Sequence, residues 1–237
     1  MRIRRFTDKE EVAAATARRC IEALRQRPGG LFCFAAGHTP VPALQQVAAA
    51  ARQGQIDPAR ARWLGLDEWE GLDGTVPGSC RATLDEHFFG PGAVPPGQIW
   101  FPSGTAADMK EECRRLNRFL AESGPLDFLL LGVGVNGHLG FNEPGQAVVD
   151  GYTITDLKPE TVRIGSKYFD DQPALARGIT LGLGSVLAAR EVVVMATGST
   201  KQAPLTALLE GASPDRLPLA CLNRHPRATV YTDSLPP

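Results

Sequence analysis

The chain has 237 residues, of which 43% are hydrophobic, and its formal net charge is −1. This length is enough for one sizeable core, whereas two full domains would be cramped, so we expect a single domain over residues 1–237. No run of basic residues is present, which argues against nucleic acid or an acidic membrane surface as the main partner. The positive charge for an anionic ligand must therefore be local.

The cysteines are odd in number and widely scattered: Cys20, Cys33, Cys80, Cys113 and Cys221. None forms a CxxC pair, so neither a zinc knuckle nor a disulfide framework is predicted. The N-terminal MRIRRFTDKE leads into no apolar segment typical of a signal peptide, and no apolar run approaches the ~20 residues that span a bilayer. We expect a cytoplasmic protein with no membrane partner, no metal and no other cofactor.

Short apolar runs alternate with amphipathic stretches, which is typical of an α/β fold. Helices are predicted at Asp8–Gln26, Pro40–Gln53, Ser79–Phe89, Ala106–Glu122, Ser185–Ala189 and Lys201–Glu210. Strands are predicted at Leu31–Ala35, Arg62–Leu66, Gln98–Phe101, Leu126–Leu131, Glu191–Ala196 and Ala228–Tyr231. We expect a three-layer αβα fold, with a mostly parallel, Rossmann-like sheet and helices on both faces. The variable stretch 146–172 is a candidate mobile lid, after which Gly178–Leu183 resumes the apolar pattern.

Four polar or glycine-rich segments directly follow predicted strands: Gly37–Thr39, Asp67, Gly132–Glu143 and Gly198–Lys201. Ligands of open α/β sheets bind outside the carboxyl ends of the strands. We therefore expect these segments to share one pocket.

The segment Gly132–Gly137 matches the dinucleotide-binding pattern GxGxxG, and Asp156 lies about twenty residues further on, as that fingerprint requires. The fingerprint also needs a full helix after its third glycine. Gly140 and Pro144 would break such a helix within two turns, so nucleotide binding is not favoured.

The same loop continues with His138, Asn142 and Glu143. An imidazole with a nearby carboxylate is the usual arrangement for a proton-transferring histidine held in one tautomer. The alternative is a tight loop whose polar groups only satisfy backbone donors and acceptors. The residues alone leave both interpretations open.

The segment Leu126–Gly145 (LDFLLLGVGVNGHLGFNEPG) resembles the loop of glucosamine-6-phosphate deaminases and the related galactosamine-6-phosphate isomerases. The motifs FAAGHTP, LGLDEWEGL and GSTK extend the resemblance over nearly the whole chain, and LDEW, PGSC and RGITLGL are closest to the galactosamine-type branch. The 6-phosphogluconolactonases of the same superfamily lack the NEPG tail, so this tail favours the deaminases.

The resemblance implies an enzyme that isomerises and deaminates a 2-amino-2-deoxyhexose 6-phosphate to a ketohexose 6-phosphate and ammonia. It implies that His138 opens the sugar ring, that Glu143 orients His138, and that Asp67 moves a proton between C2 and C1. Asp67 follows a buried strand beside Glu68, which suits a raised pKa, and only the resemblance selects Asp67 over Glu68. Asn136 replaces an aspartate that assists the histidine in many members, so assistance must come from an amide contact or from Glu143 alone.

The expected substrate- and phosphate-binding residues are Gly37, His38, Thr39, Gly137, Lys167 and Lys201. The turn Gly37–Thr39 precedes a predicted helix N-terminus, which is a ready anion site, and Lys201 would add a point charge. Lys167 stands where the family has an arginine, although Arg163 could serve instead, and the two residue types are not equivalent phosphate ligands. His38 replaces a glycine or serine, and it either narrows the site or points outward.

Two alternatives remain at this stage: a lactonase of the same superfamily and a non-catalytic sugar-phosphate sensor. The long allosteric members of the family that this chain resembles bind an acetylated sugar phosphate at a basic site, partly built from a C-terminal extension. The matching region here, Thr153–Thr155, has no basic residue, and the chain ends at Pro237 soon after the last strand, so the resemblance implies no such activation. His87 and His225 are interpreted as structural. The sequence decides neither the preferred C4 epimer nor the oligomeric state.

Overall fold

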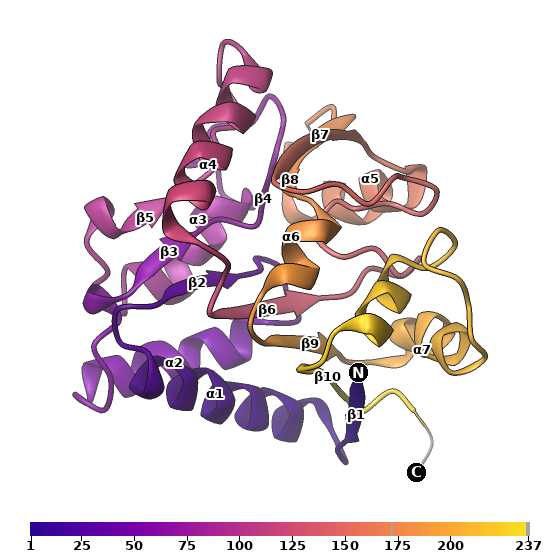
Figure 1. Cartoon of the computed structure of the whole chain (residues 1–237), viewed down its shortest axis with the longest axis horizontal. Helices are drawn as coiled ribbons and strands as arrows, with labels where there is room; N and C mark the ends of the chain where they lie inside the picture. The colour runs from indigo at the N-terminus through magenta and orange to yellow at the C-terminus, as the bar shows by residue number, and fades with distance from the viewer. Residues whose placement is uncertain (172, 236–237) are drawn as a thin grey trace.

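The computed structural model describes residues 1–171 and 173–235 (Figure 1). The last residue of the candidate lid, Gln172, lies outside the described residues. One seven-stranded sheet has the order β1-β10-β9-β6-β2-β3-β5, and every pairing in it is parallel. Its strands are β1 (Arg2–Arg5), β2 (Leu31–Phe34), β3 (Arg62–Leu64), β5 (Ile99–Trp100), β6 (Phe128–Gly132), β9 (Val192–Ala196) and β10 (Ala228–Thr232).

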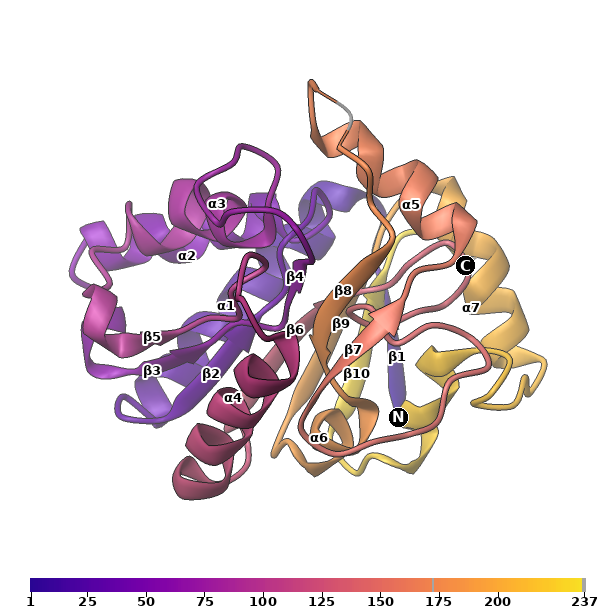
Figure 2. The same cartoon turned by 90° about the horizontal axis from the view of Figure 1, so that it is seen from above.

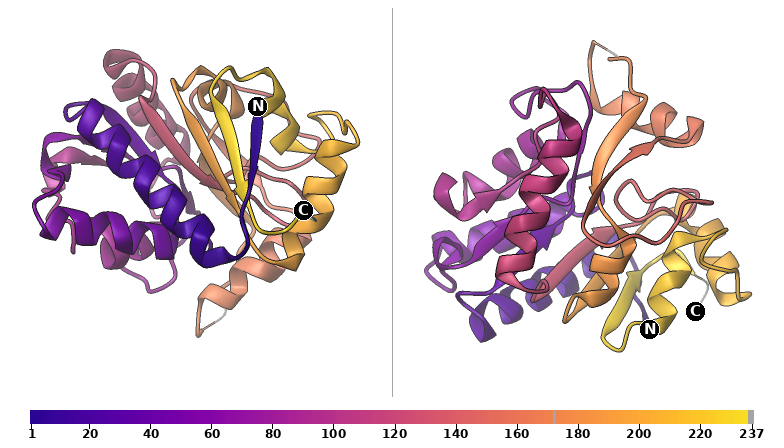
Figure 3. Two further views of the ribbon diagram at one scale, coloured as in Figure 1. Left: turned by 90° about the horizontal axis from the view of Figure 1, so that it is seen from below. Right: turned by 45° about the horizontal axis from the view of Figure 1, so that its top comes forward.

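Helices cover both faces of this sheet, as predicted. The long helices α1 (Lys9–Gln26) and α2 (Val41–Arg52) lie on the same face (Figure 3, left). The other face carries α4 (Met109–Ser123), α6 (Leu183–Ala188) and α7 (Gln202–Leu209). Successive residues of a strand point to opposite faces, so the apolar run of β6 contributes to the two hydrophobic clusters that lie on the two faces of the sheet. The three-layer αβα fold is confirmed.

A second, three-stranded antiparallel sheet was not predicted. It has the order β4-β8-β7, with β4 at Asp67–Trp69, β7 at Tyr152–Asp156 and β8 at Arg177–Leu181. The predicted strand Arg62–Leu66 was therefore too long: β3 ends at Leu64, and the chain crosses at Gly65 into the new sheet. Gly65 permits this crossing, because a Cβ there would overlap the ring of Phe101.

The candidate lid is more regular than its composition suggested. It contains β7, the helix α5 (Pro159–Gly165) and a 3₁₀ turn at Ser166–Tyr168. Figure 2 shows α5 beside β7 and β8, with the short helix α3 (Cys80–Leu84) on the other side of β4. The small sheet and its two flanking helices therefore form the walls above the carboxyl edge of the main sheet.

Helix boundaries follow local capping chemistry. The side chain of Asp8 accepts a hydrogen bond from the N–H of Glu11 and caps α1, so the helix predicted from Asp8 begins one residue later, at Lys9. The helix predicted from Ala106 begins later, because Asp108 caps α4 by accepting from Lys110 and Glu111. The predicted helix Ser79–Phe89 is α3 followed by a π-helical turn at Asp85–Phe89. Shorter 3₁₀ turns lie at Pro58–Arg60, Pro96–Gln98, Ser199–Lys201 and Pro218–Arg224. Within the described ranges, no helix is both long and apolar enough to cross a membrane.

Candidate active site

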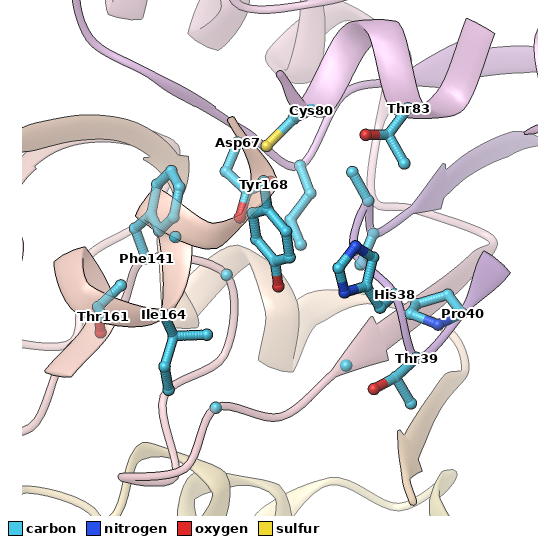
Figure 4. A pocket seen from close by; sticks show the side chains of 18 of the residues that line it. His38, Thr39, Pro40, Asp67, Cys80, Thr83, Phe141, Thr161, Ile164 and Tyr168 are labelled. Atoms are coloured by element: carbon cyan, nitrogen blue, oxygen red, sulfur yellow. The ribbon is translucent and has the colours of Figure 1, made fainter. Parts of the chain in front are cut away.

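A cavity of about 300 Å³ lies at the carboxyl edge of the parallel sheet. All four segments that the sequence placed there contribute to its lining, together with residues from α3, α5 and the turn after α5. The prediction of one shared pocket is therefore confirmed by the structure. Figure 4 shows the pocket between the loop after β2, which carries His38, and α5, which carries Thr161 and Ile164.

Asp67 faces this cavity from the start of β4. Only 6% of its surface is exposed, and its side chain lies next to the thiol of Cys80 (Figure 4). Burial, followed by the nearby charge of Glu68, raises the pKa of Asp67 to about 7, while a hydrogen bond from Cys80 acts in the opposite direction. A carboxyl group that changes charge near neutral pH is well suited to take and return a proton.

Glu68 is equally buried but does not line the cavity. Its carboxylate accepts hydrogen bonds from the backbone N–H groups of Trp69, Cys80 and Arg81, and it therefore holds the first turn of α3. Burial raises the pKa of Glu68 to about 7 in spite of these bonds. The two neighbouring carboxylates thus have different surroundings, and the geometry independently favours Asp67 as the group available to a ligand.

His138 reaches the cavity from the loop after β6. No helix occurs between β6 and β7, which agrees with the rejection of a dinucleotide fingerprint. The Nδ1 atom of His138 lies 3.1 Å from Thr161 Oγ1 and 3.5 Å from Glu143 Oε2. Its ring lies against Gly134, where any Cβ would overlap Nε2 and Cε1, so the glycine makes room for the imidazole. With Nδ1 engaged by these partners, Nε2 is the nitrogen left for a ligand.

Glu143 and Asn136 stand behind the histidine and do not line the cavity. The Nδ2 group of Asn136 donates to Glu143 Oε2 at 2.9 Å, and its Oδ1 accepts from the backbone N–H of His138 at 3.1 Å. Burial alone would raise the pKa of Glu143, but His138, Thr161 and Asn136 together hold that pKa at about 2. Asn136 therefore contacts the orienting carboxylate and the His138 backbone, rather than the imidazole.

The cavity also carries expected anion-binding groups. Gly37, His38, Thr39 and Lys201 all line it. The backbone N–H groups of Gly37–Thr39 donate to no other residue in the described part of the chain, so they are available to an anion. Burial lowers the pKa of Lys201. A cation and free N–H donors in one place are the elements of a phosphate site.

Three expected binding residues lie elsewhere. Lys167 is exposed and does not line the cavity, and the same holds for its alternative Arg163. Gly137 also lies outside the lining: its carbonyl accepts a hydrogen bond from the N–H of Leu219, and a Cβ there would overlap the side chain of Leu217. The structure therefore does not bring these residues to the ligand space, and Gly137 instead packs the loop against the C-terminal segment.

Tyr168, which the sequence analysis missed, occupies the place expected for Lys167. Its ring stands edge-on to His38, with the ring centroids 4.6 Å apart, and its hydroxyl points into the pocket (Figure 4). A Cβ on Gly37 would lie 3.9 Å from this hydroxyl, which therefore hangs over the turn Gly37–Thr39. The hydroxyl has no hydrogen-bond partner within residues 1–171 and 173–235, and it is free to bind a ligand.

The remaining histidines differ from each other. His225 is buried, and it contacts the carbonyl of Ala189 through Nε2 at 2.7 Å, which confirms its structural role. His87 lines the cavity beside Glu86, so its interpretation as purely structural is too narrow. Among the described residues, no group of three or more histidine, cysteine or acidic side chains is arranged to hold a metal ion.

Comparisons with known proteins agree with this arrangement. The family model described as glucosamine-6-phosphate isomerases/6-phosphogluconolactonase matches residues 7–231. A glucosamine-6-phosphate deaminase of Streptomyces coelicolor is 37% identical over 89% of this chain and 81% of the relative, and glucosamine-6-phosphate deaminase 2 of Giardia intestinalis is 32% identical over 94% and 86%.

Solved structures give the same picture. A monomeric glucosamine-6-phosphate deaminase superposes with a TM-score of 0.94 at 26% identity, over 99% of this chain and 98% of the other. The 6-phosphogluconolactonase of Trypanosoma brucei has a TM-score of 0.77 at 18% identity, over 98% and 96%, which supports the fold alone. On the family match and the identities, this chain belongs to the glucosamine-6-phosphate isomerase/6-phosphogluconolactonase family.

Proposed function

We propose that this protein isomerises and deaminates a 2-amino-2-deoxyhexose 6-phosphate, with glucosamine 6-phosphate as the first substrate to test. The observation that carries the proposal is the meeting of Asp67, on β4, and His138, in the loop after β6, in one cavity that Lys201 and the turn Gly37–Thr39 also line. Proton-transferring and anion-binding groups in one cavity match a sugar that carries a phosphate. Glucosamine-6-phosphate deaminases among the relatives support the same substrate class.

His138 would open the sugar ring. Its Nε2 takes the proton of the anomeric hydroxyl and delivers a proton to the ring oxygen, which breaks the C1–O5 bond and yields the open-chain aldehyde. The imidazolium that exists between these two transfers is stabilised by the ionised carboxylate of Glu143, whose pKa of about 2 keeps it charged throughout the working range. Glu143 thus stabilises the charge on His138 without itself changing protonation state.

Asp67 would then remove the proton from C2 and return a proton to C1. The C2 electron pair moves through an enol-type intermediate, so that C2 becomes an imine carbon and C1 a hydroxymethyl carbon. Water adds to C2 and ammonia leaves, which gives the ketohexose 6-phosphate. The raised pKa of Asp67, about 7, brings the carboxyl close to the pH at which it must alternate between its two forms.

The phosphate would lie on the N–H groups of the turn Gly37–Thr39, with Lys201 as its cation and the Tyr168 hydroxyl as a further donor. His38 lines the same cavity, and its ring packs edge-on against Tyr168 although the residue is exposed. Lys167 and Arg163 remain proposals as phosphate ligands, and each would have to turn from its exposed position to reach the site.

Galactosamine 6-phosphate is the second proposed substrate, because several motifs resemble the galactosamine-type branch. The curated relatives compared above carry the glucosamine name, so the C4 epimer stays open to experiment. All five cysteines are unpaired and buried, which supports a reducing cytoplasm as the proposed compartment.

The deciding experiment incubates the purified chain with glucosamine 6-phosphate and, separately, with galactosamine 6-phosphate while ammonia release is followed. We expect ammonia from at least one substrate, and the ratio of kcat/KM values assigns the epimer, since a mismatched buried hydroxyl is strongly discriminated against. A folded protein that releases ammonia from neither substrate would rule the proposal out.

The same preparation separates the alternatives. A lactonase would release acid from 6-phosphogluconolactone. A sugar-phosphate sensor would gain thermal stability from phosphosugars without turnover.

A further inference from the structure

The helix α5 is joined to the acid–base residues by two separate hydrogen bonds. Thr161, on its first turn, contacts His138 Nδ1 through Oγ1 at 3.1 Å. At the start of the helix, the backbone N–H of Lys158 donates to Glu143 Oε1 at 3.2 Å. The other oxygen of Glu143, Oε2, faces His138 and Asn136. This helix therefore holds both the imidazole and the carboxylate that orients it.

The hydroxyl of Thr161 is placed to act as the hydrogen-bond acceptor of His138. A threonine hydroxyl can accept a hydrogen bond as well as donate one. The carboxylate of Glu143 lies 3.5 Å from Nδ1 and favours a proton on that nitrogen, so Thr161 Oγ1, at 3.1 Å, accepts the Nδ1–H of His138. With Nδ1 protonated, the neutral imidazole has an unprotonated Nε2. That is the tautomer needed for Nε2 to accept a proton from the sugar.

Direct contact of His138 with Glu143 does not replace the hydrogen bond to Thr161. The distance from His138 Nδ1 to Glu143 Oε2 is 3.5 Å, which is long for a strong hydrogen bond between nitrogen and a carboxylate oxygen. Thr161 is 5% exposed, so water is largely excluded from taking its place. Of these two contacts at Nδ1, the shorter therefore comes from α5 and not from the loop that carries the histidine.

We propose that Thr161 is a positioning residue that holds His138 in the Nδ1–H tautomer, and that docking of α5 on the loop Gly132–Gly145 thereby completes the acid–base site. The proposal rests on the proposed function for its kinetic consequence, but its structural part concerns the imidazole alone. Thr161 itself lines the cavity, but removing its hydroxyl leaves the anion-binding residues Gly37–Thr39 and Lys201 in place. The loss therefore falls on kcat rather than on KM.

The test compares Thr161→Val, which keeps the shape and removes the hydroxyl, with Thr161→Ser, which keeps the hydroxyl. Thr153→Val is the matched control, because the hydroxyl of Thr153 donates a hydrogen bond to the adjacent backbone carbonyl of Ile154 and has no other hydrogen-bond partner among the described residues. We expect Thr161→Val to lower kcat at least about tenfold with KM within about threefold, and Thr161→Ser to restore most of kcat. Thr153→Val should match the parent chain.

A second readout does not depend on turnover. Long-range ¹H–¹⁵N spectra of the ¹⁵N-labelled full chain report the tautomer of His138, which is assigned by comparison with His138→Gln. The proposal expects an Nδ1–H signal in the parent chain and in Thr161→Ser, and a tautomer mixture in Thr161→Val. Thr161→Ala, which also removes the hydroxyl, replaces valine if that variant does not fold.

The outcomes separate the two claims. An unchanged tautomer and an unchanged kcat in the hydroxyl-free variant would overturn the role of Thr161. If the parent chain releases no ammonia, the proposed function fails, while the tautomer spectra still decide whether Thr161 positions the histidine.

Discussion

Burial of the ionised Asp67 lowers the free energy of unfolding, and Asp67→Asn should remove this loss of stability. The pKa of Asp67 is raised from 3.8 to about 7 in the folded chain. A carboxyl group shifted in this direction contributes stability that is complete below its unfolded pKa and is lost as the pH rises through its folded pKa. Each pKa unit corresponds to about 1.36 kcal/mol, so the charged side chain costs about 4 kcal/mol at pH 8 and about 1–2 kcal/mol at pH 5.

Asparagine stays neutral at every pH and avoids this cost. We therefore expect Asp67→Asn to be more stable than the parent chain by about 4 kcal/mol at pH 8 and by about 1–2 kcal/mol at pH 5, and to be inactive. Urea unfolding at pH 5, 6, 7 and 8 measures the stability difference between the variant and the parent at each pH. Asp73→Asn is the control, because Asp73 is exposed and bonded to Thr75, so its replacement should bring no gain at pH 8. Equal stability of Asp67→Asn and the parent at pH 8, or a pH-independent difference, would refute the reasoning.

Four further predictions concern activity. His138→Gln should lower kcat/KM by about 10²–10⁴-fold in the ammonia assay, and a near-normal value would remove His138 from the mechanism. The parent kcat/KM should rise as the pH passes through about 7, because Asp67 must be ionised to take the proton, and a flat profile from pH 6 to 8 would contradict this. Tyr168→Phe should raise KM by about 3–10-fold, the value of one hydrogen bond, with kcat within about twofold. Lys201→Met should raise KM by about tenfold or more, whereas exposed Lys167→Ala should leave it unchanged; the opposite pattern would reverse their roles.

The sequence predicted best those features that depend on local pattern and on the direction of the strands. The apolar run ending at Leu131 is a central strand, and the helix predicted at Asp8–Gln26 is present at Lys9–Gln26. Because parallel strands share one carboxyl edge, the turn at Gly37–Thr39, the loop with His138 and the segment ending at Lys201 were expected together, and they line one cavity.

The small sheet could not be predicted, because its pairing joins distant segments. Asp67 pairs with Thr180, and Thr153 pairs with the same residue from the other side. Short strands of mixed polarity carry little periodic signal, and their register depends on packing against the rest of the fold. The sequence accordingly extended the preceding strand to Leu66, and the strand Arg2–Arg5 at the other edge was missed for the same reason.

The 3₁₀ turn Ser166–Tyr168 shows how a shift of one residue changes a functional assignment. Lys167 and Tyr168 are neighbours in a 3₁₀ turn, where successive side chains point about 120° apart, so only one of them can face the cavity. The family pattern favoured the lysine, while the folded chain turns the tyrosine inward. Pro159 and Glu160 are typical of a helix start and could have located α5, but nothing in the sequence indicated that Thr161 would meet His138.

The central claim is that Asp67 moves a proton between adjacent carbons of a phosphorylated amino sugar. Its most direct test is ¹H NMR of glucosamine 6-phosphate incubated in D₂O with the parent chain and with Asp67→Asn, followed until the parent reaction is complete. We expect ketohexose 6-phosphate and ammonia with the parent chain, and unchanged substrate with the folded variant. Product formation by Asp67→Asn at the parent rate would contradict it.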